Sequence, residues 1–95
     1  MFLIKPLFTS FDKIIDCGDG YICLEVAFQH PDDRSNLYKI DKKGNQLWVA
    51  TYKGRLQLYV DLFFTDGVLK AATGAANAIL NPTTGETTSW VKDFF

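Results

Sequence analysis

The residues best suited to chemistry are the only histidine, His30, and the two carboxylates that follow it, Asp32 and Asp33. An imidazole beside a carboxylate can act as a general acid or base. A single histidine in a polar loop is, however, more often an ordinary surface residue than a catalytic one. The chain shows no Ser-His-Asp order, no phosphate-binding glycine loop and no Cys/His spacing for a metal. We therefore favour a non-catalytic protein without cofactor or metal, and keep as the alternative a small enzyme with an acid–base site inside a β-barrel.

The same loop is also the best candidate for contact with a ligand or partner. Residues 30–36 form the longest irregular stretch of the chain and its most polar one. Loops gather at the ends of a β-meander, where the strands hold them rigidly. The predicted contact surface consists of this loop and the strand that follows it, with four residues in particular: His30, Asp32, Arg34 and Tyr38.

Aromatic side chains outside the expected core form a second candidate surface. Residues 21–28 and 55–64 alternate with the period of a half-buried strand, which leaves aromatic residues on the faces opposite the core. The chain also ends in two phenylalanines, and an apolar terminus of this kind is usually docked. The residues concerned are Tyr21, Tyr59, Phe63, Phe94 and Phe95. We expect them to be core or an oligomer interface, with a hydrophobic ligand pocket as the alternative.

The elements that position these residues are short strands joined by tight turns. Asp19-Gly20 and Asp66-Gly67 have the composition of turns between antiparallel strands, because glycine tolerates a positive φ. Segment 67–80 is ambiguous, since its alanines and the spacing of its apolar residues permit one short helix. Its two glycines favour instead two strands that turn near residues 74–77, and we predict these strands.

One pattern occurs twice along the chain. Residues 37–48 and residues 78–90 each contain a short apolar strand, an Asp or Asn, a glycine turn and a strand with a tryptophan. The turn glycines, Gly44 and Gly85, are 41 residues apart. A period of this length is typical of β-propeller blades, four-stranded meanders that bury their faces only by stacking on neighbours.

The pattern resembles the blade repeat of pyrroloquinoline-quinone-type β-propellers. The residues that carry this likeness are 37–48 (LYKIDKKGNQLW), 67–73 (GVLKAAT) and 78–86 (AILNPTTGE). In that family the tryptophan packs between neighbouring blades, so the resemblance implies this role for Trp48 and Trp90. It implies a blade-like meander and does not imply the quinone, because the cofactor enzymes need a full ring of blades and a metal site.

These features together predict an all-β protein. The chain is 47% hydrophobic and 15% aromatic, which suits a globular domain rich in strands. We expect a single domain, 1–95, that folds as an antiparallel meander of about eight strands. It forms either a small barrel or sandwich, or two blade-like units at approximately 11–52 and 56–95. Two blades cannot close a ring, so the second option leads to a ring of several copies, which resembles small two-blade lectins.

The distribution of charge along the chain also suggests that copies of the protein associate with one another. The net charge is −1, but residues 1–33 sum to −4, residues 34–55 to +5 and residues 56–95 to −2. Segregated charge and apolar faces suit self-association, and we predict a homo-oligomer, most simply a dimer. No basic run supports strong nucleic-acid contact, so nucleic acid is not an expected partner.

The cysteines and the start of the chain bear on its location. Cys17 and Cys23 are the only cysteines, which favours reduced thiols over a disulfide framework. The first residues have too short an apolar run for a signal peptide, and no stretch is long enough to cross a membrane. We expect a soluble cytoplasmic interaction or small-ligand-binding module. An orphan accessory or immunity protein of a mobile gene cassette is a further alternative.

Overall fold

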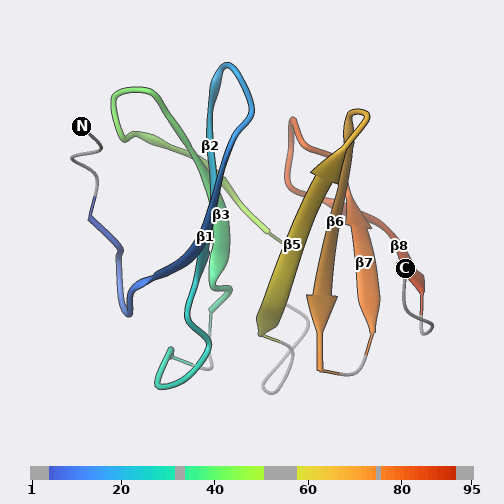
Figure 1. Ribbon diagram of the computed structural model, residues 1–95, viewed down its shortest axis with the longest axis horizontal. Helices are drawn as coiled ribbons and strands as arrows, with labels where there is room; N and C mark the ends of the chain where they lie inside the picture. The colour runs from blue at the N-terminus through green and yellow to red at the C-terminus, as the bar shows by residue number, and fades with distance from the viewer. Residues whose placement is uncertain (1–4, 32–33, 51–57, 75, 92–95) are drawn as a thin grey trace.

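The computed structural model describes residues 5–31, 34–50, 58–74 and 76–91. These residues form eight antiparallel strands in two four-stranded sheets, each paired in chain order (Figure 1). Sheet 1 contains β1 (Phe11–Asp16), β2 (Gly20–Glu25), β3 (Leu37–Asp41) and β4 (Gln46–Val49). Sheet 2 contains β5 (Tyr59–Thr65), β6 (Val68–Thr73), β7 (Asn77–Leu80) and β8 (Thr87–Val91). The prediction of an all-β meander is confirmed.

The sheets take the blade-like form among the alternatives. Sheet 1 and sheet 2 share no paired strand, so the described residues do not close into a barrel. Segment 67–80 forms β6 and β7, and the Ala76 N–H donates to Thr73 Oγ1 at 3.0 Å in the connection between them. The helix alternative for this segment is wrong, because the described part of it pairs as two strands.

The core lies between the two sheets, and strand alternation builds it. Ile22 and Leu24 point from β2 toward sheet 2, while Leu62 and Leu69 point from β5 and β6 toward sheet 1. All four side chains are almost completely buried in one cluster. Burial of a side chain of this size stabilises a fold by roughly 1.5–3 kcal/mol. β5 lies against β1 and β2, which fixes how the sheets stack (Figure 1).

Trp48 in β4 joins sheet 1 to sheet 2 by contacting the turn between β7 and β8. Its ring is buried in the common core, and its indole N–H donates to the carbonyl oxygen of Pro82 at 3.0 Å. The ring lies directly on Gly85, where a Cβ would overlap the indole. Gly85 also has a φ of +79°, which an L side chain rarely adopts. A glycine at this turn therefore serves both the backbone and the tryptophan contact.

Asn36 connects the sheets at the opposite end of the stack. Its Nδ2 donates to the Tyr59 carbonyl at 2.7 Å, and its Oδ1 accepts the Tyr59 N–H at 2.9 Å. The same Nδ2 lies 2.8 Å from the Glu25 carbonyl at the end of β2. The side chain thus replaces a strand partner for the first residue of β5. Because Asn36 is completely buried, loss of these bonds would leave backbone groups unpaired.

The two sheets pair their strands in matching registers. In each sheet the first strand pair has a bulge, between Phe11 and Lys13 in β1 and between Tyr59 and Asp61 in β5. The bulge in β5 changes the face on which its first residue lies. Simple alternation put Tyr59 beside Asp61 on an outward face, and this is wrong. Tyr59 instead belongs to the common core, with its side chain almost fully buried.

The register of β3 with β4 also matches that of β7 with β8, and this match shows that the two tryptophans do not occupy corresponding positions. Trp48 pairs with Lys39, and the corresponding pair in sheet 2 is Ser89 with Ile79. Trp90 pairs with Ala78 and packs, half-buried, on the common core from the other side. Both tryptophans therefore pack on the core between the sheets, but the register position of Trp90 does not correspond to that of Trp48. The extra residue after its glycine turn moves Trp90 to the opposite face of its sheet.

Candidate functional site

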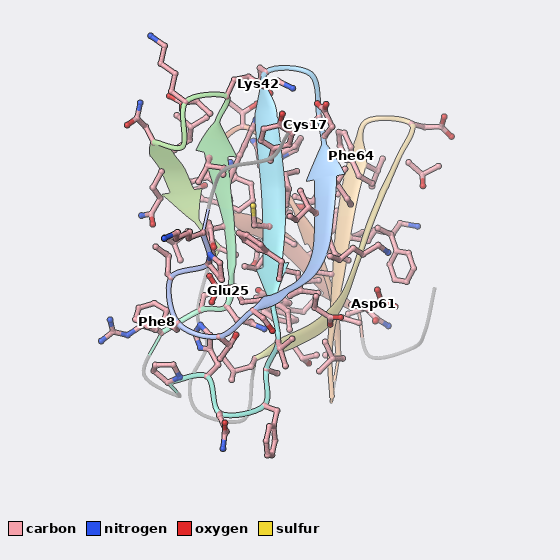
Figure 2. All side chains as sticks on the ribbon, turned by 60° about the vertical axis from the view of Figure 1, so that its left-hand side comes forward. Phe8, Cys17, Glu25, Lys42, Asp61 and Phe64 are labelled. Carbon is pink, nitrogen blue, oxygen red and sulfur yellow. The ribbon has the colours of Figure 1, made fainter. Side chains whose placement is uncertain are left out.

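A completely buried carboxylate, Glu25, organises the end of sheet 1 near the predicted contact loop. Its oxygens accept the N–H groups of Leu7 at 2.6 Å, Phe8 at 3.0 Å and Thr9 at 2.9 Å. The Tyr38 hydroxyl donates a short hydrogen bond to the same carboxylate. Figure 2 shows Glu25 and Phe8 together at this end, with Lys42 at the other end of the sheet. Glu25 therefore ties residues 7–9 to the outer face of sheet 1.

Glu25 is held in its ionised form by these donors. Burial by itself would raise the pKa of Glu25, but the Thr9 N–H, the Tyr38 hydroxyl and the N–H groups of Leu7 and Phe8 lower the pKa below its usual value. Burial and the bond to Glu25 raise the pKa of Tyr38, which stays protonated as a donor. A carboxylate whose oxygens are occupied in this way acts as a structural anchor. It is a poor candidate for proton transfer.

His30 and Arg34 meet across Phe8. The His30 ring packs edge-on against Phe8 with centroids 5.2 Å apart, and the Arg34 guanidinium lies 5.0 Å from the Phe8 centroid. His30 is buried, and its Nδ1 lies 2.9 Å from the Pro31 carbonyl, which requires a proton on Nδ1. Its buried Nε2 has no hydrogen-bond partner among the described residues. Sequence reasoning missed Phe8, around which these two residues gather.

The structure thus brings three of the four predicted contact residues to one end of sheet 1. His30 and Arg34 flank Phe8, while Tyr38 lies buried beneath residues 7–9 as the partner of Glu25. Asp32, the fourth, lies outside the described residues. An open groove of about 400 Å³ runs beside this cluster, and its walls comprise Phe8, Thr9, Ser10, Val26, Phe28 and Gln29. Tyr38 and His30 present little surface to a partner.

The predicted aromatic surface divides into three parts. Tyr59 is core, and Phe94 and Phe95 lie outside the described residues. Tyr21 and Phe63 do lie on outer faces. On sheet 1, Lys42 Nζ stands 4.3 Å above the Tyr21 ring and 3.0 Å from Asp16.

Phe63 belongs to the outer face of sheet 2, where it lines an open groove. The groove has a volume of about 470 Å³ and is bounded by Phe63, Thr65, Asp66, Val68 and Lys70. Lys13 Nζ lies 4.7 Å from the Phe63 ring centroid. Phe63 is 39% exposed and shares this groove with the exposed Val68, so the two form a small apolar patch.

Further apolar side chains accompany these aromatics on both outer faces. On sheet 1, Ile14 is 36% and Val49 is 42% exposed, in one row of paired residues with Cys23 and Tyr38 between them. Val68 is exposed beside Phe63 on sheet 2. Sequence reasoning missed these residues, although consecutive apolar residues in β1 indicate a strand with two apolar faces.

Other kinds of site find no support in the described part of the chain. There, no group of three or more His, Cys, Asp or Glu side chains is placed to bind a metal ion. No helix in the same residues has the length and apolar character to cross a membrane. Comparison of the chain with protein-family models, with curated proteins and with solved structures gives no match.

Proposed function

We propose that this protein is a non-catalytic interaction module that acts as a homo-oligomer through the outer faces of its two sheets. The observation that carries the proposal is the apolar character of both outer faces. A sheet in a two-layer domain needs one apolar face for the core, and its other face is normally polar. Here Ile14 and Val49 lie exposed on one outer face, and Phe63 and Val68 on the other.

The polar cluster supports a structural role rather than catalysis. Glu25 is saturated by three backbone N–H groups and the Tyr38 hydroxyl, and His30 is buried against Phe8 with Nδ1 bound to a carbonyl. These groups stabilise the end of sheet 1. The exposed apolar faces are then the surfaces available for recognition.

Two further proposals accompany this function. The blade-like sheets and the tryptophan contact support the relation to propeller blades that the sequence resemblance suggests, with two repeated units in the chain. Both described cysteines are free thiols, which supports a reducing compartment such as the cytoplasm. Neither proposal is required for the association of copies.

Light scattering on the protein and two phenylalanine variants tests the proposed function. The unmodified chain is expected to show the mass of an oligomer, and Phe63→Glu to shift it toward the monomer by placing a charge in an apolar contact. Phe28→Glu is the matched control, because Phe28 is 77% exposed in a loop outside both sheets. It should leave the mass unchanged. A monomer for the unmodified chain at every accessible concentration contradicts the proposal.

A further inference from the structure

The two sheets point the same way in their stack. Tyr38 pairs with Val49 in sheet 1, and the corresponding pair in sheet 2 is Ala78 with Trp90, one step before the matching bulge. Ala78 faces the common core, whereas Tyr38 belongs to a separate cluster on the far side of sheet 1. Corresponding residues therefore face the same direction in both sheets. A single rigid-body movement would therefore place sheet 1 on sheet 2 with corresponding faces pointing the same way.

A stack of this kind ends in two different faces. The face of sheet 1 that contacts sheet 2 corresponds to the outer face of sheet 2. The face of sheet 2 that contacts sheet 1 corresponds to the outer face of sheet 1. The contact inside the chain is therefore heterologous, and a heterologous contact can be repeated by further copies until a ring closes or a filament grows.

We propose that the outer face of sheet 1, where Ile14 and Val49 on its edge strands stay exposed beside the part that residues 7–9 cover, docks on the outer face of sheet 2 of a second copy in the orientation that sheets 1 and 2 have within one chain. The inference rests on the proposed function and adds its geometry. Closed rings of two, three or four copies contain four, six or eight sheets, which falls within the roughly four to eight sheets of radial β assemblies.

Ile14 illustrates what this docking buries. Ile14 pairs with Cys23, and the corresponding pair in sheet 2 is Leu62 with Ala71. Leu62 is completely buried in the common core, whereas Ile14 is 36% exposed. Docking of a second copy gives Ile14 the environment that Leu62 already has inside the chain. The exposed position of Ile14 is then explained by a missing neighbour.

The groove on sheet 2 is placed to receive Tyr21 of that neighbour. Tyr21 corresponds to Leu69 by strand pairing, and Leu69 belongs to the same core cluster as Ile22 of the other sheet. The counterpart of Ile22 on the outer face of sheet 2 is Lys70, which lines the 470 Å³ groove together with Phe63. A tyrosine is larger than the leucine it replaces, and the groove supplies the additional space.

Complementation between two variants tests the geometry. Ile14→Glu blocks only the outer face of sheet 1, and Phe63→Glu blocks only that of sheet 2. Sedimentation velocity is measured on each variant and on their equimolar mixture, at a concentration at which the unmodified chain is assembled. We expect each variant to be monomeric. The mixture should form a two-chain complex, through the intact sheet 2 of the first variant and the intact sheet 1 of the second.

The outcomes separate this inference from the proposed function. If each variant forms a dimer by itself and mixing changes nothing, like faces pair with like, and the head-to-tail geometry is wrong although the chain self-associates. If the unmodified chain is a monomer, both proposals fail. Val49→Glu and Val68→Glu are a second pair on the same faces, exposed by about 40% each. They replace the first pair if circular dichroism shows that either of those variants is unfolded.

Discussion

Two corresponding rows of residues, one on each sheet, differ in what covers them. The row Ile15, Ile22, Lys39 and Trp48 faces sheet 2, and its counterpart Phe63, Lys70, Ile79 and Ser89 faces outward. The covered row ends in a tryptophan with a hydrogen bond to the other sheet, and the outward row ends in an exposed serine. The contact between the two sheets of one chain therefore contains the buried Trp48. The proposed contact between copies has no equivalent tryptophan. We therefore expect the proposed contact between copies to be reversible.

Among the changes that test this comparison, Trp48→Ala is expected to have the largest effect on the free energy of unfolding. Removing the indole leaves a cavity between the sheets and frees the Pro82 carbonyl, at a cost of about 3–5 kcal/mol in the free energy of unfolding. Urea unfolding followed by circular dichroism measures the loss in the Phe63→Glu background, where association does not contribute. Val49→Ala, the next residue in β4 but on the outer face, should cost less than about 1 kcal/mol. Equal costs for the two changes contradict the distinction between the covered and the outer face.

Gly85→Ala should have the next largest effect on the free energy of unfolding. The added Cβ overlaps the Trp48 ring at a position with φ of +79°, so strain and repacking together cost about 2–4 kcal/mol in the free energy of unfolding. Gly18→Ala is the matched control, since Gly18 has φ of +94° but no atom within 4 Å of its Cβ position. The same denaturant titration compares them. The difference between the two variants isolates the tryptophan contact, and no difference means that the contact is absent in solution.

Glu25→Gln tests the attachment of residues 7–9 to the outer face of sheet 1, on the side away from sheet 2. The amide retains the volume but loses the charge that accepts three N–H groups, which costs about 2 kcal/mol in the free energy of unfolding near neutral pH. Because the folded pKa of Glu25 lies below its unfolded value, its contribution is complete above the unfolded pKa. It is lost as pH falls through the folded pKa.

The pH dependence gives a separate check on Glu25. The unmodified protein should lose this stability on acidification, and the Glu25→Gln variant should lack that part of the loss. Glu86→Gln serves as control because Glu86 is exposed, and its unfolding curve should stay close to that of the unmodified chain. Identical pH profiles for the two glutamine variants would show that Glu25 does not anchor residues 7–9.

Local patterns predicted most of the fold, whereas contacts between distant residues decided the site. In segment 67–80 the two glycines favoured two strands over a helix, because the preference of glycine for turns depends on neighbouring residues. The face of Tyr59 could not be predicted, since a bulge is set by the pairing with β6. The role of Glu25 was missed because its partners at residues 7–9 lie 16 to 18 positions away. Association of copies stays a prediction from exposed faces.

The most direct test of the account is to install the missing anchor, with Ser89→Trp. Ser89 corresponds to Trp48, and Gly44 of the next copy corresponds to Gly85, so the new indole should lie on that glycine turn. Sedimentation equilibrium should give a dissociation constant lower by about tenfold, or about 1.4 kcal/mol. Glu86→Trp, which adds an exposed indole outside the row, should leave the constant unchanged. A Ser89→Trp protein that associates no more tightly than the unmodified chain would contradict the claim that copies repeat the internal contact.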